Sequence, residues 1–118
     1  MKGDFKRIFL IVYALAKGTA NECDNKNCEY QWWRQPLYEY LMEQDKKIVE
    51  SVRTIMYVGR AVYTGEKFTG EKEEVYNTYN LCAKGSQEIS AREICSKTPL
   101  HKYLKCGYEY FELDILKH

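Results

Sequence analysis

The residues of this sequence best suited to chemistry are its five cysteines and two histidines. Thiolates and imidazoles are the usual ligands of structural zinc, and four residues separate Cys23 from Cys28, a spacing found in one half of such sites. The candidates for the other half of a zinc site, His101 and Cys106, are less suitable, because they lie five positions apart on a predicted helix. Five positions are about 500° of rotation, so the two side chains do not share a face. We expect loop and core thiols with no metal, and zinc on these four residues is the alternative.

The cysteine count also limits the redox chemistry. An odd number of cysteines rules out a complete set of intrachain disulfides. Cys82 and Cys106 fall on apolar helical faces, where a free thiol behaves as a small hydrophobic group. We therefore expect reduced cysteines in a cytoplasmic protein, with one disulfide involving Cys23 or Cys28 as the alternative.

A cysteine nucleophile is the next chemistry to consider. It needs a neighbouring base and surroundings that lower the pKa of the thiol. Cys95 and His101 come nearest to such a pair, but a helix break at Thr98-Pro99 separates them. The sequence has no phosphate-binding loop, dinucleotide fingerprint, serine elbow or His-Glu-x-x-His zinc helix. We therefore predict no catalytic residue and no cofactor.

Aromatic residues gather near the end of a long polar connection. Tyrosine, tryptophan and arginine are the residue types that dominate binding hot spots. Adjacent tryptophans cannot both be buried on one side of a regular element. The alternative is that this segment seals one end of a helical bundle. We predict a partner-binding surface formed by Tyr30, Trp32, Trp33, Arg34 and Tyr38.

Length and composition exclude several protein classes. The chain has 118 residues, which suits one domain, residues 1–118, and leaves no room for a second large core. With 45% hydrophobic residues and two prolines, it is not a disordered chain. Its net charge of +1 is unlike that of a non-specific nucleic-acid binder. A minor nucleic-acid role is an alternative, because basic residues cluster at Lys97, His101, Lys102 and Lys105.

Apolar residues recur at helical spacing along most of the chain, and no segment alternates as a strand does. The clearest run is Ile48, Val52, Ile55, Met56, Gly59, Val62 and Tyr63. We predict an all-α bundle of five to six helices with one long connection at 18–34. The predicted helices are 4–17, 35–45, 46–64, 71–84, 88–96 and 98–116. We expect 46–64 to be central, with 4–17 and 98–116 packed against it and Gly59 admitting a closely packed helix.

Local signals place the helix ends. Residues 35–64 form either one helix or two, because Asp45 is a suitable N-cap for a second start. Thr98 is the expected N-cap of the last helix, with Pro99 at its first position. Ser90 and Glu93 have the spacing of a capping box. The near-repeat at 64–72 predicts a hydrophilic turn.

Residues 1–16 allow two interpretations. A basic start, an apolar run at 8–12 and a small-x-small tripeptide at 14–16 are typical of a short signal peptide. The apolar run is shorter than the roughly 20 residues of a membrane span. Helical periodicity, which a signal peptide does not need, favours a structural helix and is carried by Phe5, Ile8, Phe9, Val12, Leu15 and Ala16.

Two short segments carry a family resemblance. They are residues 55–60, Ile-Met-Tyr-Val-Gly-Arg, and residues 98–104, Thr-Pro-Leu-His-Lys-Tyr-Leu, with Gly107 beyond the second. Together they resemble an uncharacterised family of short helical bacterial proteins over about residues 45–111. The resemblance implies a helical fold and carries no activity, and the segment 18–34 departs from the family's pattern.

The absence of a catalytic constellation and the surplus of aromatic residues favour a non-catalytic protein-binding module. Small size and richness in Lys, Asn and Tyr suit a phage or mobile-element protein that inhibits a bacterial defence complex by occlusion, as anti-CRISPR proteins do. We expect a protein partner in the cytoplasm of a bacterial cell and no membrane. A homodimer is an alternative, because helical proteins of this size often expose an apolar strip.

Overall fold

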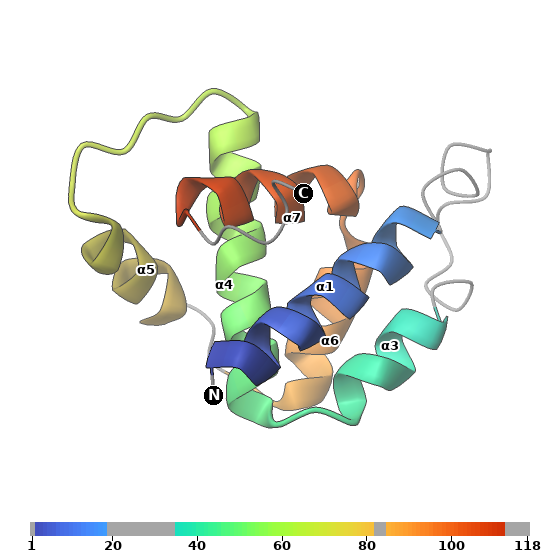
Figure 1. Ribbon diagram of the computed structural model, residues 1–118. Helices are drawn as coiled ribbons and strands as arrows, with labels where there is room; N and C mark the ends of the chain where they lie inside the picture. The colour runs from blue at the N-terminus through green and yellow to red at the C-terminus, as the bar shows by residue number, and fades with distance from the viewer. Residues whose placement is uncertain (1, 19–34, 82–84, 113–118) are drawn as a thin grey trace.

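The computed structural model describes residues 2–18, 35–81 and 85–112, and these form helices connected by turns, without strands (Figure 1). The all-α prediction is confirmed. None of the described helices has the length and apolar character needed to cross a membrane. The helices are α1 (Lys2–Gly18), α3 (Gln35–Met42), α4 (Lys46–Tyr63), α5 (Lys72–Leu81), α6 (Gln87–Ser96) and α7 (Leu100–Tyr110).

Helix α4 is the centre of the molecule, as its apolar periodicity predicts. It starts anew after α3, because Asp45 has an extended backbone and its side chain accepts a hydrogen bond from the Lys47 amide at 3.2 Å. Residues 35–64 are therefore two helices. Helices α5 and α6 flank α4 on opposite sides, and α7 crosses it (Figure 1).

The crossing of α4 and α7 is a contact between backbones. A Cβ atom placed on Gly59 would lie 1.8 Å from the carbonyl oxygen of Tyr103. A Cβ atom on Gly107 would lie 2.1 Å from the carbonyl oxygen of Ile55. Both distances are far below any real Cβ contact, so only glycine fits at either position. The predicted close approach at Gly59 is confirmed.

Helix α1 packs mainly against α7 and α3, rather than directly on α4 as predicted. Its apolar face reaches the core chiefly through α7, where the rings of Phe9 and Tyr108 lie 4.9 Å apart. Tyr108 is buried in the core beside Phe9. The core therefore forms where α1, α3, α4, α6 and α7 meet, and α5 contributes no fully buried residue.

Polar contacts attach α5 to the outer face of α4. The Ser51 and Tyr76 hydroxyls lie 2.8 Å apart, and the Thr54 hydroxyl donates to Asn80 Oδ1 at 2.9 Å. Tyr76 also lies edge-on against Phe111, at a ring separation of 5.8 Å. Hydroxyl hydrogen bonds and aromatic contacts therefore attach α5 to α4 more than buried aliphatic side chains do.

Three predicted helix ends were wrong. Ser86, not Ser90, caps α6 by accepting a hydrogen bond from the Ile89 amide at 3.2 Å. Pro99 occupies the N-cap position of α7, so Thr98 lies outside the helix, and the peptide bond between them is cis. Helix α7 ends at Tyr110 instead of residue 116, because the backbone turns at Glu112, whose φ is 57°.

Candidate functional site

The predicted aromatic surface is only partly within the described residues. Tyr38 is half-buried on α3, where its ring packs against the core. This contact is compatible with both predicted roles of the aromatic segment, which are to seal one end of the helical bundle or to bind a partner. The other four members, Tyr30, Trp32, Trp33 and Arg34, lie outside the described residues.

The alternative zinc site is not assembled in the described part of the chain. His101 and Cys106 both lie on α7, and residues 2–18, 35–81 and 85–112 contain no group of three potential ligands in metal-binding range. The other two candidates, Cys23 and Cys28, lie outside the described residues.

The environments of the two described cysteines do not suit nucleophilic chemistry. Cys95 is 3% exposed and belongs to the hydrophobic core, so a substrate has no access to its thiol. Cys106 is half-buried, and burial raises its thiol pKa, with the nearby Glu109 carboxylate adding to the effect. A raised pKa lowers the thiolate fraction at neutral pH.

A polar network that the sequence did not suggest joins α4 to α6. Arg53 is 7% exposed. Its Nη2 atom lies 2.8 Å from Oε2 of Glu93, and its Nη1 atom donates to the Ser90 hydroxyl at 3.3 Å. The Tyr57 hydroxyl donates to the other carboxylate oxygen of Glu93. These contacts offset part of the cost of burying the three groups, and among the described residues the Nε atom of Arg53 is buried without a hydrogen-bond partner.

This network shifts the titration of Tyr57. Burial, followed by the hydrogen bond and the negative charge of Glu93, raises the pKa of Tyr57 to about 12. The guanidinium groups of Arg53 and Arg60 act in the opposite direction and are outweighed. Tyr57 therefore stays neutral at physiological pH, where it serves as a hydrogen-bond donor and not as a base.

Above this network, rings and cations lie at the ends of α4 and α6 and at the start of α7. The Lys97 ammonium lies 5.5 Å from the centroid of the Tyr57 ring, and the rings of Tyr63 and Tyr103 lie edge-on, 5.5 Å apart. The Tyr103 hydroxyl donates to the carbonyl of Thr98 at 3.1 Å, which ties α7 to the α6–α7 connection. We call this the α4–α7 surface; its members are Tyr57, Arg60, Tyr63, Lys97, Lys102 and Tyr103.

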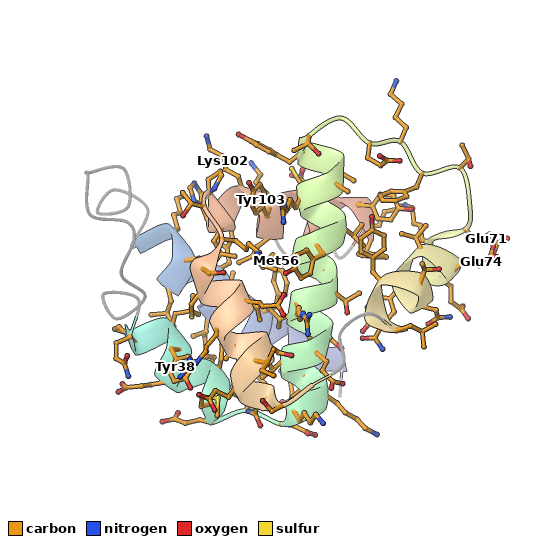
Figure 2. All side chains as sticks on the ribbon, turned by 180° about the vertical axis from the view of Figure 1, so that it is seen from behind. Tyr38, Met56, Glu71, Glu74, Lys102 and Tyr103 are labelled. Carbon is orange, nitrogen blue, oxygen red and sulfur yellow. The ribbon has the colours of Figure 1, made fainter. Side chains whose placement is uncertain are left out.

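The α4–α7 surface has exposed cations on both of its helices. Arg60 and Lys102 are exposed, and neither forms an ion pair with a carboxylate in the described ranges. Figure 2 shows Lys102 and Tyr103 on one side of α4, and Glu71 and Glu74 on the other. The α4–α7 surface is therefore a basic and aromatic area on a protein whose overall charge is nearly balanced.

The sequence contains part of the signal for this surface. Arg53, Tyr57 and Arg60 have the i, i+4, i+7 spacing of one helical face, interleaved with the apolar residues of the core face. The basic cluster that includes Lys97 and Lys102 is also visible in the sequence. Their convergence depends on the crossing of α4 and α7, which brings together residues about forty positions apart.

Comparison with protein-family models, curated proteins and solved structures finds no match. The family resemblance of residues 45–111 therefore stays a prediction.

Proposed function

We propose that this protein is a non-catalytic binding module whose ligand is another protein. The observation that carries the proposal is the exposed Tyr63 ring, 46% accessible, held against Tyr103 beside the exposed Arg60. Tyrosine and arginine are enriched at the centres of protein interfaces, where they combine a large contact area with hydrogen-bonding groups. Here they lie on two helices whose relative position is fixed by a backbone contact.

The interior polar groups support a structural role for the network beneath this surface. Arg53, Tyr57 and Glu93 bind one another, and the pKa of Tyr57 is raised away from neutrality. A general base needs a pKa near the working pH, so this tyrosine is poorly suited to acid–base chemistry. The network instead joins α4 to α6, and the Tyr57 ring lies beneath the Lys97 ammonium.

The finer form of the proposal is inhibition by occlusion. In this form, a phage or mobile-element product covers a working surface of a bacterial defence complex in the cytoplasm, in the manner of an anti-CRISPR protein. The size and composition of the chain support it. A compact helical protein needs no chemistry for this activity, only a rigid surface complementary to that of its partner.

Two surfaces are candidates for the contact. One is the aromatic segment predicted from the sequence, Tyr30, Trp32, Trp33, Arg34 and Tyr38. The other is the α4–α7 surface. Tyr38 lies at the α3 end of the molecule and Tyr103 near the crossing of α4 and α7, so separate variants can test the two (Figure 2).

The test is affinity capture from the cells that produce the protein, using the wild-type chain, Trp32→Ala/Trp33→Ala and Arg60→Glu/Tyr63→Ala. Lys47→Glu is a matched control, because it reverses an exposed charge on α4 about 20 Å from Arg60. We expect one protein to co-purify in a stoichiometric amount with the wild type and the control.

The variants then assign the contact. Loss of that protein with Arg60→Glu/Tyr63→Ala supports the α4–α7 surface, and loss with the tryptophan variant supports the aromatic segment. Recovery of no stoichiometric partner by the wild-type chain, from cells in which it is abundant, would overturn the proposed function.

A further inference from the structure

We infer that the α4–α7 surface binds an acidic segment of the partner, a stretch of chain rich in Asp and Glu. The inference rests on the proposed function, because it specifies the chemistry of the protein that the module binds. It follows from the charge, the ring arrangement and the rigidity of this surface.

The cations of the surface outnumber its anions. Glu93 is the carboxylate within the network, and Arg53 pairs with it at 2.8 Å, so the two charges offset each other. Arg60 and Lys102 remain as excess positive charge. Arg60 and Lys102 are exposed and form no ion pair with any described carboxylate, so a ligand does not have to break an existing bridge to reach them. Charge complementarity therefore favours an anionic ligand.

The rings favour a polypeptide as the source of that charge. Tyr63 and Tyr103 present an exposed and a half-buried ring in an edge-to-face pair, which offers apolar contact to the methylene groups of Glu side chains and to backbone. Two excess cations, Arg60 and Lys102, on a short surface match a few carboxylates. Double-stranded nucleic acid carries about one negative charge per 1.7 Å and therefore needs a longer row of basic residues. The net charge of the whole chain is only +1, so little additional positive charge is present for such a ligand.

The surface is rigid before any ligand arrives. Gly59 and Gly107 place the backbones of α4 and α7 in direct contact, one turn away from Tyr63 and Tyr103. The hydrogen bond from Tyr103 to the Thr98 carbonyl fixes the adjacent connection. A surface that needs no ordering on binding loses less conformational entropy, so a modest number of contacts suffices for measurable affinity.

The experiment measures fluorescence anisotropy of a labelled probe peptide of alternating Glu and Gly, titrated with the full-length chain. A peptide with Gln in place of Glu is the neutral control. Labelled oligouridylate tests whether the surface prefers nucleic acid to an acidic peptide. The protein variants are Arg60→Glu and Lys102→Glu, with Lys47→Glu as the matched charge reversal. All three positions are exposed, and circular dichroism checks that each variant is folded.

We expect the Glu peptide to bind and the Gln peptide not to. Arg60→Glu and Lys102→Glu should each weaken binding at least about fivefold, and Lys47→Glu should change it less than about twofold. Equal loss with Lys47→Glu, equal binding of the Gln peptide, or tighter binding of oligouridylate would each overturn the inference. If the Glu peptide fails while the wild-type chain still captures a stoichiometric partner, the inference falls and the proposed function stands.

Discussion

Tyr63 of α4 and Tyr103 of α7 meet edge to face, one helical turn away from the glycines at which the two helices touch. The ring pair is therefore a direct consequence of the glycine contact, because Gly59 and Gly107 let the two helix backbones touch one turn away from the rings. Fold and candidate binding surface share the same structural element, and a change at the crossing should affect both.

The first prediction concerns that crossing. Gly59→Ala should destabilise the protein by about 3 kcal/mol or more, because its Cβ atom would overlap backbone that no rotamer change can move. Gly70→Ala is the control, since a Cβ atom there meets nothing within 4 Å. Urea denaturation followed by circular dichroism measures both. Equal stabilities of the two variants would contradict the observed helix crossing.

The second prediction tests the core. Leu104→Ala and Ile55→Ala should each lower the free energy of unfolding by about 2–5 kcal/mol, because both side chains are buried at the α4–α7 contact. Leu81→Ala removes the same side chain as Leu104→Ala from a position that is 66% exposed, and should cost less than about 0.5 kcal/mol. A loss below about 1 kcal/mol for Leu104→Ala would show that this core is misassigned.

The third prediction concerns the ion pair between α4 and α6. Glu93→Gln should destabilise the protein by about 2–3 kcal/mol, since it leaves the buried Arg53 guanidinium without a counter-charge. Glu88→Gln is a suitable control, because Glu88 pairs with Arg92 on the exposed face of the same helix. Chemical denaturation at neutral pH compares the two, and a Glu93→Gln variant no less stable than Glu88→Gln would contradict a structural role.

The fourth prediction is a pH dependence. The folded state raises the pKa of Tyr57 from 10.0 to about 12, so this tyrosine contributes stability that is complete below pH 10 and is lost as the pH rises toward 12. Tyr57→Phe should therefore lose less stability than the wild type between these two pH values. Denaturation midpoints across this range provide the measurement, and parallel curves for the two proteins would refute the assignment.

The sequence predicts the framework of the fold well where one local signal dominates. The apolar spacing within 46–64 identifies α4, and Asp45 correctly marks its start. Gly59 is visible as a place where another helix can approach. These features depend on neighbours within one or two turns, so a single sequence contains enough information to find them.

The sequence predicts tertiary polar contacts poorly. Ser90 and Glu93 have the spacing of a capping box, yet both side chains bind Arg53, and Ser86 takes the capping role. Arg53 lies about forty residues away in the chain, so no local pattern reveals that it competes for them. The sequence does not reveal the α4–α7 surface for the same reason, because its residues on α4 and α7 come together only through the crossing.

Binding of the partner at the α4–α7 surface is the central claim. Chemical-shift mapping of the 15N-labelled chain, with the Glu peptide and then with the captured partner, tests that claim directly. We predict that the largest amide shifts fall within residues 57–64 and 97–105 in both titrations. Shifts concentrated on α3 or α5, with those two segments unaffected, would contradict it.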